Sequence, residues 1–175
     1  MNLIATWDVL TRSEEETISL GRAIGDSLSP GDAVLISGAL AAGKTRLVQG
    51  IAEGLRTADR PRSPTFVLVN RHIGRLVLHH CDLYRLEGVM EVEDLGLMER
   101  VENGDVLAVE WPERGRMALP EDALEVTMEQ GSGEDDRSVT LMQNGPASSR
   151  LLQAARSSFN EGNKGHAGVA GKAGS

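Results

Sequence analysis

The stretch SGALAAGKTR, residues 37–46, follows directly on the apolar run Ala33–Ile36 and decides how this chain folds. Within it, Gly38-x-x-x-x-Gly43-Lys44-Thr45 matches the phosphate-binding loop pattern in full, where a strand passes into a helix. Glycine permits the positive φ angles through which successive backbone N–H groups point at an anion. Lys44 offers a mobile charge for the outer phosphates, and Thr45 offers a hydroxyl for Mg²⁺. The stretch therefore predicts a site for a nucleotide phosphate chain.

Periodic apolar residues on both sides of this loop predict alternating helices and strands. Ser13-x-x-Glu16 has the form of a capping box and predicts a helix to about Leu28, followed by a turn at Pro30-Gly31. Apolar residues at helical spacing predict a helix directly after the loop. Further predicted elements are strands at Thr65–Val69 and Arg75–Cys81 around a turn at Asn70–Gly74, a helix at Glu91–Glu102 that Gly104 ends, a strand at Val106–Val109, and a hairpin of Leu124–Met128 and Ser138–Met142.

This order predicts an α/β fold of the P-loop NTPase kind, a three-layer sandwich. Its sheet is mainly parallel, with helices on both faces and a C-terminal β-hairpin. Residues 1–143 form the predicted domain. Residues 144–175 form a tail rich in Ala, Gly and Ser, in which we expect a short helix at Leu151–Arg156 and disorder beyond about Asn160.

Composition narrows the class of protein. The chain has 175 residues, of which 40% are hydrophobic, as expected for one globular domain. No stretch approaches the roughly 18 consecutive apolar residues of a membrane span. The N-terminus has no basic start and turns acidic early, which argues against a secretory signal. The single cysteine, Cys81, excludes an internal disulfide and favours a small buried residue in a reducing cytoplasm.

The charge distribution bears on partners. The formal net charge is −8, and because residues 146–175 carry +3, residues 1–145 carry −11. A broad DNA- or RNA-binding face needs clustered Lys and Arg, which an acidic body lacks. A role on nucleic acid would therefore run through a partner protein.

Two carboxylates end predicted strands. Asp82 ends RLVLHHCD, and Glu110 ends DVLAVE, where four apolar residues precede the acid. Nucleotide hydrolysis needs groups that hold the metal and orient water. In parallel sheets such groups belong at the carboxyl ends of the strands, beside the phosphate loop. The alternative for each is a solvated carboxylate at a strand end.

The run His79-His80-Cys81-Asp82 suggests zinc at first, but neighbours on a strand point to opposite faces and no second group of ligands follows. Three of the few aromatic residues, Phe66, Tyr84 and Trp111, lie in the short polar stretches SPTF, DLYR and EWPER. That concentration favours a site, while a core position stays open for Phe66.

With these stretches in order, GALAAGKT, SPTFVLVN, HCDLYRL, EDLGL and VEWPER, the sequence resembles the TsaE (YjeE) family from about Ser13 to Met142. That family supplies the ATPase subunit of the bacterial system that makes threonylcarbamoyladenosine in tRNA. The resemblance implies a small P-loop ATPase with ATP and Mg²⁺, slow alone and stimulated by its partners. It implies docking on TsaD, which transfers the threonylcarbamoyl group, and on its companion TsaB, with tRNA reached only through that complex.

The resemblance also assigns residues. Asp82, Glu110 and Lys44 are the implied catalytic residues, and Thr45, Glu110 and Asp82 are the implied metal-associated ones. The mobile, switch-like segment corresponds to Ser63, Pro64, Thr65 and Phe66. Implied nucleotide contacts are Gly38, Ala39, Leu40, Ala41, Ala42, Gly43, Lys44, Thr45, Arg46, Trp111 and Arg137. Which carboxylate touches the metal directly, and which handles water, stays open.

Two loop positions depart from the family. An acidic residue is frequent where Ala39 stands, and glycine where Ala41 stands. If position 41 needs a positive φ, alanine costs about 1–2 kcal/mol there. The phosphate loop also permits two other functions. One is a small-molecule kinase, against which stands the lack of an Arg-rich lid, and the other is a binding switch whose hydrolysis matters little.

Overall fold

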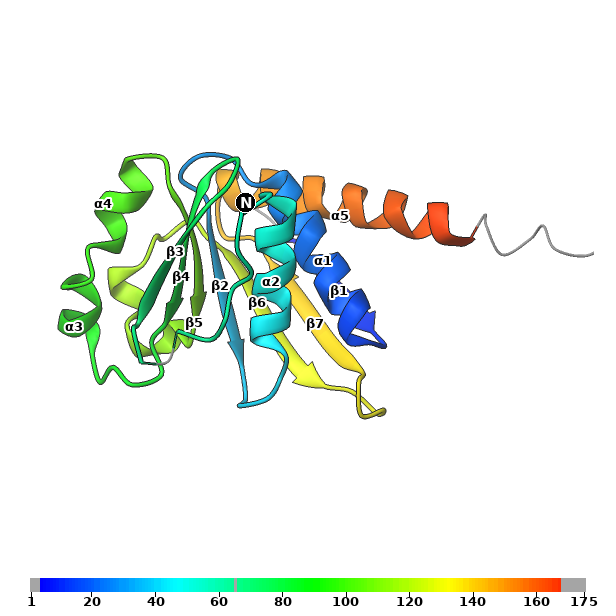
Figure 1. Ribbon diagram of the computed structural model, residues 1–175, viewed down its shortest axis with the longest axis horizontal. Coiled ribbons are helices and arrows are strands. Elements are labelled where there is room, and N and C mark those ends of the chain that lie inside the picture. Colours follow the sequence, from blue (N-terminus) through cyan, green and yellow to red (C-terminus); the bar gives the residue numbers. More distant parts are fainter. Residues whose placement is uncertain (1–3, 65, 168–175) are drawn as a thin grey trace, which may run out of the picture.

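The computed structural model describes residues 4–64 and 66–167, which form one seven-stranded sheet with helices on both faces (Figure 1). The strands are β1 (Thr6–Thr11), β2 (Ala33–Gly38), β3 (Val69–Ile73), β4 (Val77–Asp82), β5 (Val106–Glu110), β6 (Leu124–Gln130) and β7 (Arg137–Met142). The helices are α1 (Glu14–Ser27), α2 (Lys44–Gly54), α3 (Val89–Glu93), α4 (Leu97–Glu102) and α5 (Pro146–Ala167), with short 3-10 helices η1 (Pro112–Arg114) and η2 (Arg116–Ala118).

The strand order is β1-β7-β6-β2-β5-β4-β3. The central strands β6, β2, β5 and β4 run parallel, and β1, β7 and β3 are antiparallel to their neighbours. The predicted α/β class and the β6–β7 hairpin are therefore confirmed. Parallel strands of this kind bury both faces, which accounts for the continuous apolar runs in β2 and β5.

Side chains alternate between two cores along β2. Val34 and Ile36 face the core shared with α1, α2 and α5, whereas Ala33 and Leu35 face the core on the α3 and α4 side. The sheet therefore lies between two helical layers, as the three-layer prediction requires. Among the described residues, no helix is long and apolar enough to cross a membrane.

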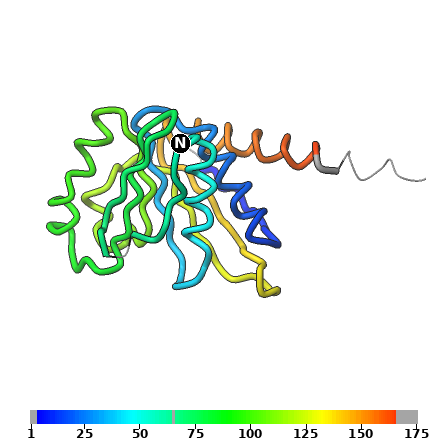
Figure 2. Tube along the Cα trace, viewed as in Figure 1, coloured from blue at the N-terminus to red at the C-terminus, as the bar shows by residue number. Residues whose placement is uncertain are grey.

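Helices α1 and α2 lie side by side, as both traces show (Figures 1 and 2), and glycines let their backbones touch. A Cβ on Gly21 would overlap the carbonyl oxygen of Leu47, and a Cβ on Gly50 would overlap that of Ile18. Gly25 and Gly54 repeat the arrangement one turn further along. Only glycine fits so close a helix crossing. The contact fixes α2, and hence the loop that precedes it, against α1.

Helix α5 corrects the expectation for the tail. The helix expected at Leu151–Arg156 is present but longer, from Pro146 to Ala167, so the disorder expected from about Asn160 is wrong as far as Ala167. Residues 168–175 lie outside the described part. Leu151 and Leu152 are buried in the core with α1, and the Phe159 ring lies 5.7 Å from that of Trp7. Packing against the domain therefore holds the helix that composition alone disfavours.

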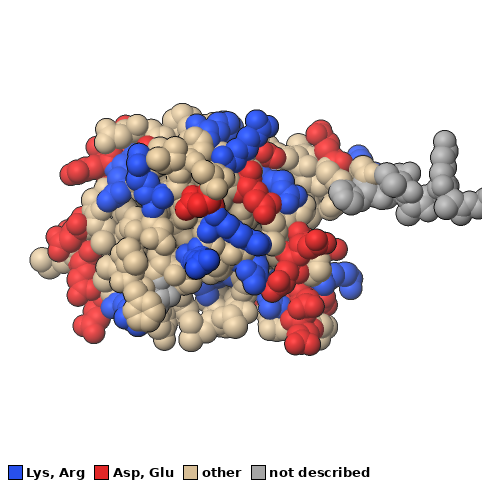
Figure 3. All heavy atoms as spheres, in the orientation of Figure 1, with Lys and Arg blue, Asp and Glu red and all other residues tan. Residues whose placement is uncertain are grey.

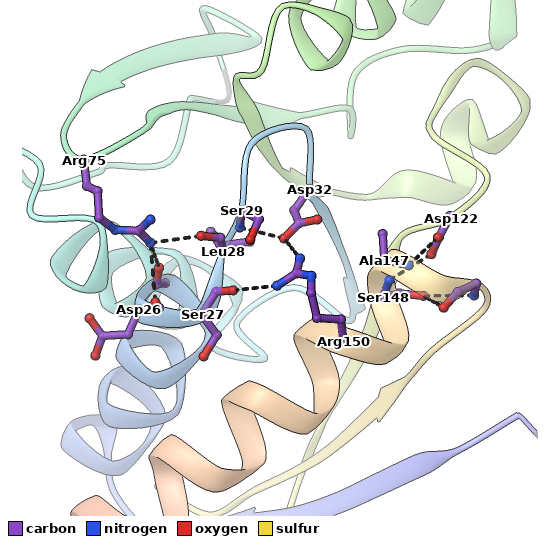
Figure 4. A network of polar contacts seen from close by, with 12 residues as sticks. Asp26, Ser27, Leu28, Ser29, Asp32, Arg75, Asp122, Ala147, Ser148 and Arg150 are labelled. Carbon is purple, nitrogen blue, oxygen red and sulfur yellow. Dashed lines mark hydrogen bonds and ion pairs between the residues drawn. The ribbon is translucent and has the colours of Figure 1, made fainter.

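A polar network joins the start of α5 to the edge of the sheet where β2 begins (Figure 4). Asp122 accepts hydrogen bonds from the backbone N–H groups of Ala147 (2.7 Å) and Ser148 (2.9 Å). Although burial opposes it, hydrogen bonding to the Ser148 side chain and to these two backbone N–H groups, with the field of Arg150, lowers the pKa of Asp122. Arg150 in turn forms an ion pair with Asp32. The C-terminal helix is thus anchored at its first turn.

Two other predictions differ from the structure. Residues 70–73 were expected in a turn but belong to β3, which pairs with β4 from Val69↔Cys81 to Ile73↔Val77. Of the strand expected at Thr65–Val69, Val69 is confirmed, residues 66–68 are not in a strand, and Thr65 lies outside the described residues. The single helix expected at Glu91–Glu102 is two, α3 and α4. They are separated where Gly96 adopts a φ of +66°, a left-handed conformation that ends a helix.

Candidate functional site

The loop between β2 and α2 has the geometry that its glycines predict. Gly43 has a φ of +92° at the start of α2, and Ala41 has a φ of +62°. A Cβ on Gly38 would lie 2.6 Å from the carbonyl oxygen of Met128, so the neighbouring strand β6 also excludes a side chain there. The loop therefore needs glycine at both ends. Ala41 does adopt a positive φ, so the strain expected for alanine in that conformation applies here.

Lys44 lies inside this loop. Its Nζ donates to the carbonyl oxygens of Gly38 and Ala39, each at 2.7 Å, and lies 4.6 Å from the centre of the Trp111 ring. The side chain is buried, and this burial lowers the pKa of Lys44 against the opposing fields of Glu110, Asp82 and Glu113. The loop thus holds a partly desolvated ammonium group next to an indole face.

Asp82 and Glu110 lie side by side at the ends of parallel strands β4 and β5, in register with each other. Both are buried. Glu110 Oε1 accepts from the Thr45 hydroxyl (3.2 Å), and Asp82 Oδ1 accepts from the Tyr84 backbone N–H (2.9 Å). The two predicted carboxylates therefore meet the first turn of α2 at one edge of the sheet.

One contact of the site, between His80 and Glu110, was not predicted from the sequence. His80 Nε2 lies 3.2 Å from Glu110 Oε2, inside the protein. The signal was present, because His80 and Asp82 share one face of their strand.

His79, on the other face, contacts Asp105 (2.7 Å) and Arg100 (3.1 Å), and burial lowers its pKa. Burial also raises the pKa of the Cys81 thiol to about 12.

Two aromatic residues follow the carboxylates closely in the chain, and their rings contact each other. The rings of Tyr84 and Trp111 are 4.8 Å apart, and Trp111 directly follows Glu110. Phe66 is not a core residue, because 82% of it is exposed, with the Arg85 guanidinium 4.3 Å from its ring centre. Two of the three predicted aromatics therefore line the site, and the third lies on the surface.

The segment 63–66 reaches the site through its first residue. The Ser63 hydroxyl donates to Asp82 Oδ2 (3.4 Å), and Pro64 accepts the backbone N–H of Leu68 (2.8 Å). Thr65 lies outside the described residues. The segment thus runs beside one of the two carboxylates.

The remaining predicted residues lie around the loop. Arg137 Nε donates to the Ala42 carbonyl (3.0 Å), so this arginine braces the loop from β7. Arg46 turns toward α1, where it forms an ion pair with Glu14 (3.3 Å). Leu40 is exposed at the tip of the loop. A cavity of about 340 Å³ lies between residues 38–42 and β6.

The oxygen atoms of this site suit a hard divalent cation. Magnesium prefers carboxylate and hydroxyl oxygens, and the Thr45 hydroxyl and Glu110 carboxylate are already in contact, with Asp82 on the next strand. A lysine, a hydroxyl and two carboxylates at one loop can together hold a phosphate chain, its metal and a water molecule.

Comparisons with known proteins agree with this geometry. A family model described as threonylcarbamoyl adenosine biosynthesis protein TsaE matches residues 11–139. The tRNA threonylcarbamoyladenosine biosynthesis protein TsaE of Treponema pallidum is 40% identical over 119 residues, covering 68% of this chain and 88% of the relative. Its namesake in Bacillus subtilis is 36% identical over 132 residues, covering 75% and 82%.

Among solved structures, the crystal structure of Bacillus subtilis YdiB superimposes with a TM-score of 0.75 at 28% identity, covering 89% of this chain and 97% of that one. The similarity to YdiB supports the P-loop NTPase-like fold. The superposition with YdiB covers more of this chain than residues 11–139, which the family model matches.

Proposed function

The chain belongs to the TsaE family of tRNA threonylcarbamoyladenosine biosynthesis proteins, and from this premise we propose that it binds ATP with Mg²⁺ and hydrolyses it. The proposal is carried by the meeting of Lys44 and Thr45 with Asp82 and Glu110 at the carboxyl ends of parallel strands. Ligands of open α/β sheets bind at that edge. The hydrolysis would serve threonylcarbamoylation of the adenosine next to the anticodon.

Loop residues would bind the phosphates. The N–H groups of residues 38–45 provide neutral donors, and the positive end of α2 adds to them. Lys44 now donates to two carbonyl oxygens of the loop. A phosphate oxygen is the stronger acceptor for an ammonium group, so the lysine is expected to turn to it. Trp111 stacks under the same ammonium and limits its reach.

The carboxylates would divide two tasks. Bound Mg²⁺ would neutralise charge on the phosphates, and Thr45 with Glu110 and Asp82 would supply its protein oxygens. The carboxylate that does not touch the metal would orient the attacking water. Contacts from His80 and Thr45 hold Glu110, and contacts from Ser63 and Tyr84 hold Asp82. Both acids are therefore oriented in advance.

Docking on homologues of TsaB and TsaD would couple ATP binding and hydrolysis to tRNA modification, and tRNA would be reached through that complex. Exposed apolar side chains beside a site are typical of protein interfaces. Phe66, Val67 and Leu40 are such side chains, and the segment that carries the first two begins at Ser63, which contacts Asp82. Binding of nucleotide would favour docking, and hydrolysis would reset the complex in the cytoplasm.

The deciding experiment measures ATP hydrolysis with and without TsaB and TsaD homologues, alongside tRNA modification. We expect slow hydrolysis alone and faster hydrolysis in the complex. Lys44→Ala should abolish hydrolysis and modification, whereas Lys164→Ala, which removes the same charge from exposed α5, should leave both intact. Full modification by the Lys44→Ala protein would contradict the proposal. Transfer of labelled phosphate to a metabolite would instead identify a kinase.

A further inference from the structure

A second cavity lies away from the phosphate loop. It measures about 580 Å³ and is bounded by the chain that follows α2, by α2 itself and by strand β3. Arg60 and Arg62 of that chain and Arg71 of β3 line it, and it shares no residue with 38–46. Three arginines therefore border one hollow that the proposed hydrolysis does not use, and all three are exposed. Arg71 is paired with His79 and its charge acts on that residue, so its side chain lies on the opposite face of β3 from His72.

The walls of this arginine cavity are held in place. Gln49 Nε2 of α2 donates to the Pro61 carbonyl (2.9 Å), and the Ala58 N–H donates to the Ile73 carbonyl at the outer edge of β3 (3.3 Å). Asp59 Oδ2 lies 2.9 Å from His72 Nδ1. The chain that carries Arg60 and Arg62 is thus attached to both a helix and a strand.

The arginines that border the cavity form no ion pairs within the described residues, although Asp59 also lines it and Arg60 borders a second hollow with Glu14, Glu15, Glu16, Asp26 and Glu53. Over residues 4–64 and 66–167, Arg60, Arg62 and Arg71 take part in no ion pair, and the nearby carboxylate of Asp59 is engaged by His72. Figure 3 shows Lys and Arg side chains gathered near the middle of this face, over the chain that leads from α2 toward β3. On a chain of net charge −8 such a cluster is exceptional.

A polar atom in the cavity wall also lacks a partner. His72 is buried and lines the cavity, and in the described part of the chain its Nε2 forms no hydrogen bond. A buried polar atom without a partner is destabilising. Because Nδ1 donates to the Asp59 carboxylate, Nε2 is an acceptor, which ordered water or a donor group of a ligand, such as a phosphate hydroxyl, relieves. The neighbouring Asn70 adds a side-chain amide to the same wall.

We propose that the arginine cavity binds a phosphate group. Guanidinium is planar and presents paired N–H donors that match two phosphate oxygens at once. The phosphate can belong to an RNA backbone or to a small phosphate compound, and both offer the same oxygens. The site is independent of ATP hydrolysis, because its residues are separate from Lys44, Thr45, Asp82 and Glu110.

Inorganic phosphate is the first probe, in a Lys44→Ala background so that the phosphate loop does not contribute. Titration calorimetry compares that protein with versions that also carry Arg60→Gln/Arg62→Gln or Arg71→Gln. We expect at least tenfold weaker binding for the first and a smaller change for the second, because the Arg71 side chain lies on the opposite face of β3 from His72. Arg156→Gln changes an exposed residue of α5 away from the cavity and should change the affinity less than twofold. Unfolding temperatures verify that each variant is folded.

A 17-nucleotide RNA stem-loop is the second probe, followed by fluorescence anisotropy at several salt concentrations. If RNA is the source, it binds more tightly than inorganic phosphate, and each arginine removed lowers the salt slope by about one. Arginine-dependent binding of phosphate but not of RNA assigns the cavity to a small phosphate compound. If the arginine variants leave both affinities within twofold of their parents, the proposal is overturned. ATP hydrolysis by the same variants, with Lys44 restored, stays unchanged in either case.

Discussion

His80 and Glu110 contact each other inside the protein, with the histidine Nε2 3.2 Å from one carboxylate oxygen. The other oxygen of Glu110 accepts from Thr45. Two contacts on opposite oxygens fix the rotation of the carboxylate, so the orientation of a group at the candidate metal site depends on a residue that does not itself reach the loop.

Replacing His80 should therefore impair catalysis more than folding. We expect His80→Leu to lower ATP turnover about 10- to 100-fold, as for other residues that orient metal-associated ligands. His80→Gln keeps an N–H near the position of Nε2 and should recover most of the activity. His79→Leu, which breaks contacts with Asp105 and Arg100 instead, is the control. Equal losses for the Leu and Gln variants of His80 would argue against this role.

The left-handed backbone conformation of Ala41 is strained and lowers the stability of the folded protein. Since alanine is strained at a φ of +62° and glycine is not, Ala41→Gly should raise the free energy of unfolding by about 1 kcal/mol or slightly less. Ala42, next in the chain, has no positive φ and is buried. Ala42→Gly should therefore lower the same quantity. Urea denaturation measures both, and a loss of stability in the first variant would refute the strain.

The glycine contact between α1 and α2 should not tolerate a methyl group. Gly21→Ala or Gly50→Ala would push a Cβ into a carbonyl oxygen of the other helix, so we expect losses of about 2 kcal/mol or more in unfolding free energy. Gly162 of α5 has nothing within 4 Å of an added Cβ. Gly162→Ala should accordingly stabilise the protein by up to about 1 kcal/mol. Thermal unfolding of the three variants separates packing from helix propensity.

Asp122 should make stability depend on acid. Its pKa is lowered from the ordinary 3.8 in the folded protein, so its ionised form contributes stability above about pH 4, and that contribution is lost as pH falls through the lowered value. Asp122→Ala should cost about 1 kcal/mol at pH 7, as for the loss of a helix cap, and the difference from the parent should shrink below pH 4. Glu121→Ala is the exposed control. A difference that is constant from pH 7 to pH 3 would contradict the assignment.

The phosphate loop, its flanking elements and the two carboxylates followed from local rules. A glycine pattern between a strand and a helix specifies its own backbone, and apolar runs that end in an acid specify strands buried on both faces. Because parallel strands end at a common edge, Asp82 and Glu110 had to meet once β4 and β5 were neighbours.

Where long-range contacts decide, the sequence was a poor guide. Asn70 is a typical turn residue, yet pairing with β4 places it within a strand. Gly162 and Gly165 disfavour a helix, yet packing near Phe159 and Leu152 sustains one. Strand β1 was missed, and within the described residues it is an edge strand held by pairing with β7, far along the chain. The arginine cavity depends on the true position of β3, so no local pattern could reveal it.

Strand β2 separates the anchor of α5 from the phosphate loop by the length of the strand. Asp32, just before the strand, holds Arg150 of α5, and Gly38 at its other end opens the phosphate loop. Six residues of extended chain span about 20 Å. A fluorescent label or surface tether at the first turn of α5 would thus be remote from the phosphate loop, and binding could be followed on an immobilised protein without blocking that edge of the sheet.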